Sequence, residues 1–364
     1  MKKIVTIIGA RPQFIKAAAV SREMRKQSAL KEIIIHTGQH FDDNMSEIFF
    51  REMEIPTPAY NLNIHGLLHG AMTGQMMEGI EKILIAEKPE CVLVYGDTNS
   101  TLAGALAASK LHIKIAHVEA GLRSFNYKMP EEINRILTDR ISNILFVPTD
   151  TAIKNLEAEG FKNFPSRIIK NGDVMQDAAM YYSKTSAQHS KIISSLGFTG
   201  ATHAAKNFVL ATLHRQENTD DLNVLKRLLN ALNKINEETR VVVPLHPRTK
   251  NIIDQHNLKA TFKIIDPVGY FDMIELLKHC SLVITDSGGL QKEAFFFHKH
   301  CITLREQTEW VELAQHGFSL VAGSDELKIQ NAFEHFRTMK SDFNVNLYGN
   351  GKASEVIAET LLNS

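Results

Sequence analysis

Short runs of apolar, mostly β-branched residues alternate along the chain with stretches that have a helical pattern. Such alternation is typical of βαβ units, in which helices join parallel strands. In the first half the predicted helices cover residues 12–26, 43–52, 72–87, 99–110, 131–141 and 150–158, and they separate the predicted strands KIVTIIG, EIIIHTG, CVLVYGD, KIAHVEA and ILFVPT. We therefore predict an α/β fold built on parallel sheets.

The same alternation restarts in the second half, with predicted strands RIIKNGD, NFVLATLHR, RVVVPLHPR, FKIIDPVG, SLVITDSGG and CITLREQTEW. A domain usually has about 100–200 residues, so the 364 residues predict two Rossmann-like domains, residues 1–170 and 171–364, with a last helix able to pack back on the first. The polar stretch SKTSAQHSKIISSLGFTGATHAAK is the expected variable segment near the junction. Because ligands bind at the carboxyl ends of parallel strands, where polar tips accumulate here, we expect the domains to face a central cleft.

The composition argues against several kinds of partner. Lys and Arg together number 41, as do Asp and Glu, so no overall field collects nucleic acid or an anionic membrane surface. Apolar runs stay far below the roughly 20 residues that a membrane-spanning helix needs. Cys91, Cys280 and Cys301 are far apart and lie in or beside apolar runs, which favours buried, reduced thiols. We expect a soluble, cytoplasmic protein.

The stretch IVTIIGARPQFIKAAAV predicts an anion site after the first strand. A dinucleotide site would need G-x-G-x-x-G, but this stretch has one glycine. Pro12 suits the first turn of a helix. Arg11 and Lys16 then stand at a helix N-terminus, where the dipole and free N–H groups favour an anion. The alternative is that both cations are solvated surface charges.

The stretch ITDSGGLQKEAFFF predicts a second anion site. Ser287, Gly288 and Gly289 are small enough to let backbone amides approach a phosphate at the start of the next helix. One helical turn further on, Glu293 is placed to accept hydrogen bonds from ribose hydroxyls. An ordinary tight turn is the alternative, but two anion sites, one in each domain, suit a diphosphate that carries a nucleoside.

Acidic residues stand at the strand tips of the first half. Asp97, Glu119 and Glu131, the last beside Glu132, would be unfavourable near a phosphate unless they bind a metal, orient a substrate or move protons. No metal is required by this pattern. Asp97 could instead cap a helix and Glu131 could complement a helix dipole.

Two histidines follow apolar strands of the second half. His214 lies in ATLHRQEN and His246 in VPLHPRTKN, so both are expected near the ligand, where an imidazole protonates or hydrogen-bonds a departing phosphate oxygen. The alternative is a structural role, which is the commoner one for a lone histidine.

Together these motifs resemble one known family. GARP with Lys16, YGDTNSTLAG, HVEAGLRS, PEEINR, LHRQEN and TDSGGLQKEA, in this order, resemble the non-hydrolysing UDP-N-acetylglucosamine 2-epimerases. The resemblance implies a GT-B-type fold, a homodimer, no metal or other cofactor, and inversion at C2 of a UDP-linked 2-acetamido sugar. It implies catalytic roles for Asp97, Glu119, Glu131 and His214. It implies binding of UDP by Arg11, Lys16, Ser287, Gly288, Gly289 and Glu293. We also expect Arg123, His246 and Arg305 to bind UDP or substrate.

The implied mechanism is elimination of UDP to give a 2-acetamidoglucal, followed by re-addition after the C2 proton returns to the other face. Trp310 stands where many members of the family have an arginine, and GLLHGAMTGQ replaces a glutamine-rich pattern. These changes resemble the branch that acts on UDP-2,3-diacetamido-glucuronic acid. A hydrolysing 2-epimerase, a GT-B glycosyltransferase that uses a UDP-sugar, and a nucleotide-sugar sensor without catalysis are the alternatives.

Overall fold

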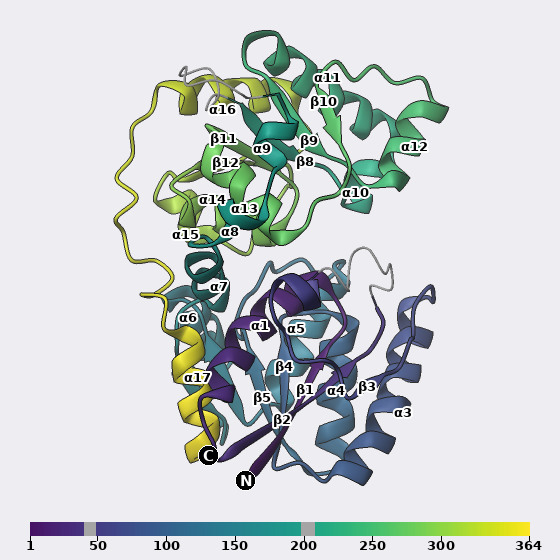
Figure 1. Cartoon of the computed structure of the whole chain (residues 1–364), viewed down its shortest axis with the longest axis vertical. Helices are drawn as coiled ribbons and strands as arrows, with labels where there is room; N and C mark the ends of the chain where they lie inside the picture. Colours follow the sequence, from purple (N-terminus) through teal and green to yellow (C-terminus); the bar gives the residue numbers. More distant parts are fainter. Residues whose placement is uncertain (40–48, 198–207) are drawn as a thin grey trace. The chain divides into compact units, whose positions relative to one another are not determined.

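The structure is a computed structural model that describes residues 1–39, 49–197 and 208–364. It contains two compact units, one formed by Met1–Met180 with Asn346–Ser364 and one formed by Tyr181–Val345 (Figure 1). The first unit thus extends past residue 170 and includes the C-terminal segment. Most of the helix expected at 43–52, and residues 198–207 of the polar stretch, lie outside the described residues.

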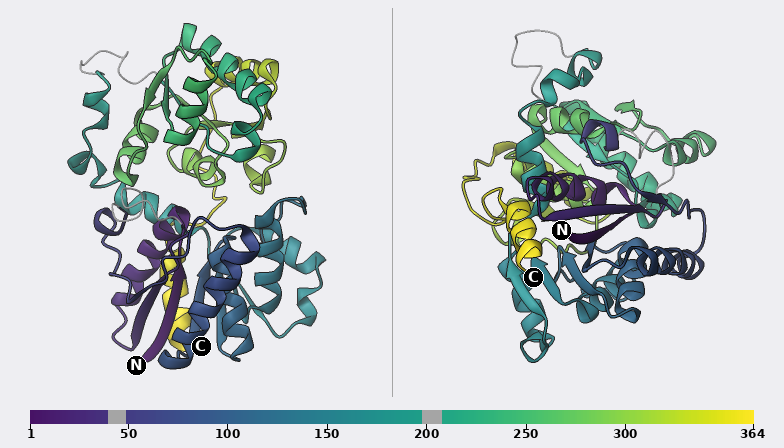
Figure 2. Two further views of the ribbon diagram at one scale, coloured as in Figure 1. Left: turned by 90° about the vertical axis from the view of Figure 1, so that its right-hand side faces the viewer. Right: turned by 60° about the horizontal axis from the view of Figure 1, so that its bottom comes forward.

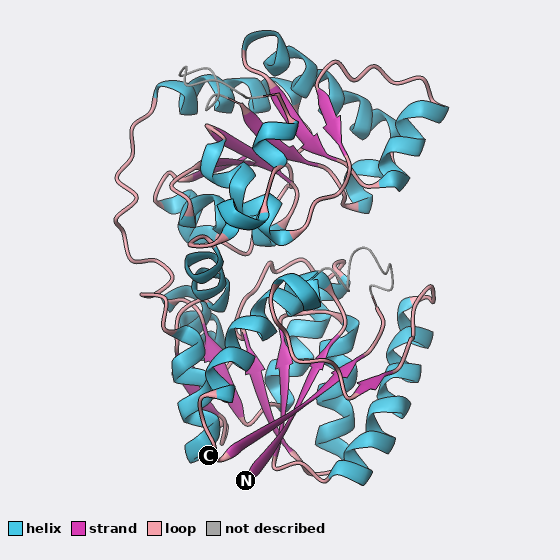
Figure 3. Cartoon of the chain, in the orientation of Figure 1, coloured by secondary structure: helices cyan, strands magenta, loops and turns pink. Residues whose placement is uncertain are grey.

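The described residues of the first unit form a parallel seven-stranded sheet with the order β3-β2-β1-β4-β5-β6-β7. Helices cover both faces of this sheet (Figure 3). The strands are β1 Lys2–Ile8, β2 Leu30–His36, β3 Tyr60–Asn61, β4 Cys91–Tyr95, β5 Lys114–Val118, β6 Ile144–Val147 and β7 Arg167–Lys170. The helices are α1 Arg11–Arg25, α3 His69–Glu87, α4 Asn99–Lys110, α5 Pro130–Ile141, α6 Asp150–Ala158, the 3₁₀ turn η1 Phe161–Asn163, α7 Val174–Tyr182, which runs on into the second unit, and α17 Ala353–Asn363.

The second unit repeats the architecture with a parallel six-stranded sheet of described residues, order β10-β9-β8-β11-β12-β13. Its strands are β8 Val209–Thr212, β9 Val241–Pro244, β10 Lys263–Ile265, β11 Leu282–Thr285, β12 His300–Thr303 and β13 Ser319–Val321. Its helices are α8 Ser186–His189, α9 Ile192–Ser195, α10 Gln216–Thr219, α11 Leu222–Glu238, α12 Pro247–Gln255, α13 Tyr270–His279, α14 Gly288–Phe296, α15 Val311–Gln315 and α16 Glu326–Thr338. The predicted α/β class with two parallel-sheet domains is therefore confirmed.

Strand order decides where a ligand can bind. The central strands are apolar because helices cover them from both sides, and every residue of β4, CVLVY, is buried. In each sheet the direction of winding reverses once, between β1 and β4 in the first unit and between β8 and β11 in the second. Ligands of open α/β sheets bind at such a reversal, beyond the carboxyl ends of the strands. The predicted site residues follow these four strands or their close neighbours.

Three strands differ from the expectation. RIIKNGD was expected to open the second half, but β7 pairs with β6 at the edge of the first sheet. The short edge strands β3 and β13 were not predicted. At the other end of the chain, α17 packs against α1, and the Lys2 ammonium donates to the Ser364 carbonyl at 3.0 Å (Figures 1 and 2).

The cysteine prediction is confirmed, because Cys91, Cys280 and Cys301 are all buried and free. Burial raises the pKa of each thiol to about 12, so these groups stay protonated and unreactive. Within the part of the chain that the structure describes, no helix is long and apolar enough to span a membrane.

Candidate active site

The turn after β1 shows why this chain has a single glycine there. A Cβ on Gly9 would lie 1.9 Å from the Thr37 hydroxyl oxygen and 2.4 Å from the Ser100 hydroxyl oxygen, so only glycine fits. The Gln13 side chain accepts hydrogen bonds from the amide of Gly9 at 2.8 Å and from the following amide at 3.0 Å, and it donates to the Tyr95 carbonyl at 2.9 Å. The turn is thereby attached to the end of β4, and α1 begins directly behind it at Arg11.

The two cations predicted at this site, Arg11 and Lys16, differ in their surroundings. Lys16 is 6% exposed and forms an ion pair with Glu119. Arg11 lies at the first position of α1, with its guanidinium 4.8 Å from the ring centre of Phe49. Glu119 follows β5 with a left-handed φ of 72°, which turns its carboxylate toward the neighbouring strand tip. A predicted catalytic acid and a predicted phosphate-binding cation are therefore direct partners in one unit.

Asp97 is held by a buried arginine that the sequence analysis did not single out. Arg135 Nη2 donates to the Asp97 carboxylate at 2.6 Å, and Arg135 Nη1 donates to Glu132 at 2.8 Å. Asn134 Nδ2 donates to the Asp97 carbonyl at 2.8 Å. The cap of α4 is Thr98, so the alternative that Asp97 caps this helix is wrong.

The two glutamates at the start of α5 have different roles. Glu132 is completely buried and accepts hydrogen bonds from the amides of Ser124 and Phe125 at 2.9 and 2.8 Å. It is a structural group that holds the loop before α5. Glu131 is partly exposed in the first turn of α5, where it also complements the helix dipole. Of this pair, Glu131 is the one that a substrate could reach.

Arg123 was expected to contact substrate. The structure places it 3% exposed, with Nη1 2.8 Å from Asp139 and with Nε and Nη2 paired to Glu159 at 2.6 and 2.8 Å. Because both sides of the guanidinium are taken up by these carboxylates, we place Arg123 in the support of the loop after β5.

In the second unit, His214 and Asp286 meet where β8 and β11 end. His214 Nδ1 lies 2.8 Å from Asp286 Oδ1, and the other carboxylate oxygen accepts from the amides of His214 and Arg215 at 2.9 and 3.0 Å. Burial alone would raise the pKa of Asp286, but the His214 charge and these hydrogen bonds hold it at about 2. The His214 side chain is 51% exposed, so a buried anion supports an imidazole that solvent reaches.

The turn after β11 becomes the N-terminus of α14, as predicted. Ser287 is the N-cap, with its hydroxyl accepting from the Leu290 amide at 3.4 Å, so the amides of Gly288 and Gly289 open the helix. A Cβ on Gly288 would lie 2.5 Å from Glu309 Oε1, and Arg305 Nη1 donates to the other Glu309 oxygen at 2.8 Å. A buried Arg–Glu pair therefore lies against the helix start.

Two further predicted site residues, Glu293 and His246, lie in the second unit. Glu293 is 6% exposed on α14. His246 caps α12, accepting from the Arg248 amide at 3.2 Å, so one of its nitrogens has a structural role. Trp310 is 3% exposed, and the Lys292 ammonium lies 3.9 Å from its ring centre.

The motifs did not single out Gln13, Arg135 and Glu309, nor the contact of the Asp286 carboxylate with His214. The sequence does contain an indication of Arg135, because Glu132 and Arg135 are three positions apart on a predicted helix and such residues are neighbours. In the described ranges, no group of three or more His, Cys, Asp or Glu side chains is arranged to hold a metal ion.

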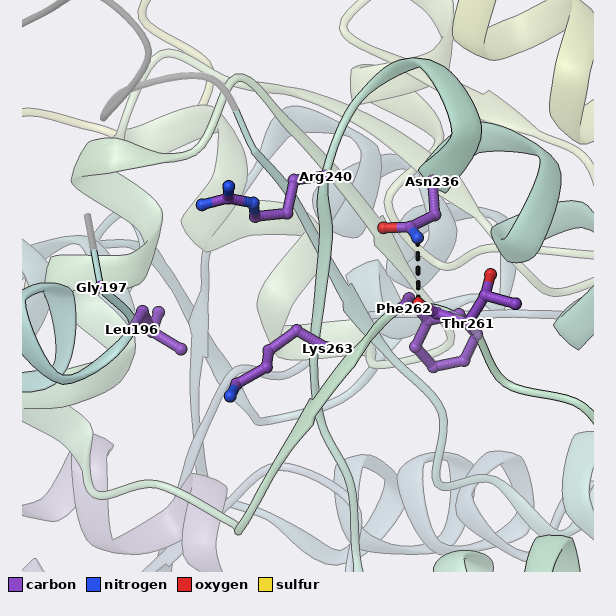
Figure 4. A pocket seen from close by; sticks show the side chains of 7 residues that line it. All are labelled: Leu196, Gly197, Asn236, Arg240, Thr261, Phe262 and Lys263. Atoms are coloured by element: carbon purple, nitrogen blue, oxygen red, sulfur yellow. Dashed lines mark hydrogen bonds between the residues drawn. The ribbon is translucent and has the colours of Figure 1, made fainter.

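An open depression of about 540 Å³ lies elsewhere in the second unit, where β9 and β10 begin (Figure 4). It is lined by Leu196, Gly197, Asn236, Arg240, Thr261, Phe262 and Lys263. None of the predicted site residues lines it. It lies at the amino ends of the strands, whereas His214 and Asp286 lie at the carboxyl ends.

Two parallel-sheet units, each with polar side chains at its strand-order reversal, define the class of nucleotide-binding α/β proteins. Comparison with known proteins is more specific: the chain belongs to the UDP-N-acetylglucosamine 2-epimerase family, whose model matches residues 22–362. The UDP-2,3-diacetamido-2,3-dideoxy-D-glucuronate 2-epimerase of Pseudomonas aeruginosa is 55% identical over 362 residues, 99% of each chain.

Solved structures agree with this assignment. The Methanocaldococcus jannaschii UDP-GlcNAc 2-epimerase, crystallised in complex with UDP-GlcNAc and UDP, is 41% identical with a TM-score of 0.90 over 100% of both chains. The UDP-GlcNAc 2-epimerase of Neisseria meningitidis, bound to UDP-GlcNAc, is 30% identical with a TM-score of 0.89, again over 100% of both chains.

Proposed function

We propose that this protein is a non-hydrolysing isomerase that inverts C2 of a UDP-linked 2-acetamido sugar. The observation that carries the proposal is the pair of carboxylates at the ends of adjacent strands, Asp97 after β4 and Glu119 after β5, each held by a buried cation. Epimerisation needs proton transfer at both faces of C2, and two carboxylates at the carboxyl ends of neighbouring strands meet that requirement.

The reaction must begin at C1. A C2–H bond next to no activating group is far too weak an acid for a carboxylate, so the C1–O bond breaks as the proton leaves. The C–H electron pair forms the C1–C2 double bond, and the C1–O pair departs with UDP. The second group begins the reaction as a carboxylic acid, protonates the other face of C2 and ends as a carboxylate, while the first group keeps the proton that it removed. A UDP phosphate oxygen re-forms the bond to C1.

The departing diphosphate needs positive partners. In the first unit we assign this role to Arg11 and Lys16, since cations fixed in advance stabilise charge as it develops. The backbone amides at the start of α14 are the proposed anion-binding groups of the second unit. His214 is the proposed proton donor or hydrogen-bond partner of the phosphate oxygen, and Asp286, 2.8 Å from its Nδ1, orients the imidazole. As Lys16 turns from Glu119 to phosphate, the carboxylate becomes a stronger base.

For the substrate we propose UDP-2,3-diacetamido-glucuronic acid in preference to UDP-N-acetylglucosamine. The relative with that activity is 55% identical, whereas UDP-N-acetylglucosamine 2-epimerases of Methanococcus maripaludis and M. jannaschii are 43% and 41% identical. We further propose a cytoplasmic homodimer, which light scattering at several protein concentrations tests.

The experiment is incubation with each UDP-sugar in deuterium oxide, followed by NMR of the products. The proposal predicts a nucleotide sugar with deuterium at C2 in both epimers, formed faster from the diacetamido-glucuronate. Free sugar and UDP would indicate the hydrolysing alternative, and a requirement for an acceptor would indicate a transferase. Complete absence of exchange with binding retained would indicate a sensor.

A further inference from the structure

His117 lies in the centre of the first sheet and is completely buried. It is on β5, opposite Val94 of β4 and Leu145 of β6. Its ring Nε2 is 2.8 Å from the Gly96 carbonyl oxygen, and its Nδ1 is 2.7 Å from Asp139 Oδ1. Both ring nitrogens therefore have a partner, and the imidazole is held in one orientation.

The hydrogen-bond partners of His117 determine which of its ring nitrogens carries a proton. A carbonyl oxygen only accepts hydrogen bonds, so Nε2 carries a proton. Burial pushes the pKa of Asp139 upward, but the hydrogen bond and charge of His117 and those of Arg123 outweigh it and keep the pKa below its usual range. Asp139 holds the other side of the ring through Nδ1, so the proton on Nε2 stays directed at the Gly96 carbonyl.

The Gly96 carbonyl belongs to the turn that carries Asp97. The Gly96 amide donates to the Val118 carbonyl at 2.9 Å, and the Asp97 carbonyl accepts from Asn134 at 2.8 Å. The peptide between Gly96 and Asp97 is therefore held on each side, and the bond from His117 fixes its carbonyl. Gly96 has a left-handed φ of 62°, a conformation that this bond helps to maintain.

The same turn touches the other predicted catalytic group. A Cβ on Gly96 would lie 3.3 Å from Glu119 Oε2 and 3.3 Å from Lys16 Nζ. His117 lies on β5 and precedes Glu119, which follows the strand, by two residues. The buried ring is thus bonded to the turn that carries Asp97 and lies on the strand that leads to Glu119.

We propose that His117 is a positioning residue: through the proton on Nε2 it holds the Gly96 carbonyl, and with it Asp97, in the geometry that proton transfer at C2 requires. It has no contact with solvent and so does not itself exchange protons with substrate. The proposal rests on the proposed function for its kinetic consequences, whereas the proton on Nε2 can be observed without any substrate.

Two substitutions separate the bonds of His117. The amide nitrogen of a glutamine falls near the position of Nε2, and that of an asparagine near Nδ1. His117→Gln therefore keeps a donor for Gly96, and His117→Asn keeps a donor for Asp139 alone. Displacing a catalytic group by about 1 Å costs up to about 100-fold in rate. We expect kcat to fall by about 100-fold in His117→Asn but to stay within about tenfold of the parent in His117→Gln.

A purely structural role would not produce this split. KM and the Kd for UDP should be unchanged in both variants, and their melting temperatures should be similar. His300→Gln is the matched control, because His300 is also buried and hydrogen-bonded, to Ser341 at 2.8 Å, but in the second unit. That control should retain the parent kcat. Equal loss of kcat in both His117 variants would overturn the proposal.

Neutron crystallography of the perdeuterated parent protein tests the Nε2 donor even where a variant does not fold. A deuteron on His117 Nε2, directed at the Gly96 carbonyl, is expected, and its absence there would overturn the proposal. If the parent protein catalyses no C2 exchange, the proposed function fails, while the neutron result still decides the protonation of His117. If the parent is active and the two variants are equal, only this inference fails.

Discussion

Replacing Asp286 by Asn tests the link between a buried carboxylate and the exposed His214. The substitution keeps the size of the side chain but removes the charge that faces His214 Nδ1 at 2.8 Å. If the new amide oxygen keeps the backbone bonds to His214 and Arg215, its NH₂ group must point at Nδ1 and force that nitrogen to accept. His214 then cannot hold a proton there, and we expect kcat to fall by about 100-fold.

The stability effect follows from the pKa of Asp286. The folded protein lowers it from 3.8 to about 2, because the His214 charge and the hydrogen bonds outweigh burial. A difference of one in pKa corresponds to about 1.4 kcal/mol, so the charge of this fully buried group contributes about 2 kcal/mol to folding. The folded pKa is depressed, so this stability is present above about pH 4 and is lost as the pH falls toward 2.

The assay is urea unfolding at several pH values between 5 and 2, followed by tryptophan fluorescence. Trp310 is the only tryptophan in the sequence and is buried in the second unit, so its emission reports on the unit that contains Asp286. The difference in unfolding free energy between the parent and Asp286→Asn should shrink by about 2 kcal/mol from pH 5 to pH 2.

Asp325→Asn is the control, since Asp325 caps α16 in the same unit and Asn caps a helix equally well. This variant should keep the parent stability and kcat. A stability difference between the parent and Asp286→Asn that does not change with pH, or an unchanged kcat, would show that Asp286 does not act through its charge on His214.

Three further substitutions test the first unit. Glu119→Gln should abolish deuterium exchange at C2, measured by NMR, and leave UDP affinity in calorimetry nearly unchanged; normal exchange would remove this residue from the mechanism. Gly9→Ala places a methyl group 1.9 Å from the Thr37 hydroxyl oxygen and should destabilise the unit by about 1–3 kcal/mol in urea unfolding, whereas an unchanged midpoint would contradict the close packing. Arg135→Met leaves the buried Glu132 charge unpaired and should cost about 3–5 kcal/mol by the same measurement; a loss below about 1 kcal/mol would show that the pair is dispensable.

Much of the fold was predictable because local pattern and long-range packing agree. Central strands such as β4 are buried on both faces, so they appear in the sequence as continuous apolar runs between helices. The edge strands are harder to predict from the sequence. β3 has two residues and β13 has three, too few for any periodicity, and β7 could be assigned to the first sheet only from its pairing with β6.

The candidate site was predictable to the level of the motif but not always to the residue. Glu131 and Glu132 are adjacent, so they point about 100° apart around α5. The packing of α5 decides which of them is buried. Glu132 is buried because it binds the amides of Ser124 and Phe125, and that contact cannot be found from the helical pattern. Likewise, the sequence predicted the turn at Asp286 but not its contact with His214, because that contact depends on β8 and β11 being neighbours.

The most direct test of the central claim is a crystal structure of Glu119→Gln with the intact UDP-sugar bound. We expect the sugar C2 to lie within reach of the Asp97 carboxylate and the residue-119 amide, at the ends of β4 and β5. A sugar whose C2 is turned away from both strand ends would contradict the proposed roles of these two groups.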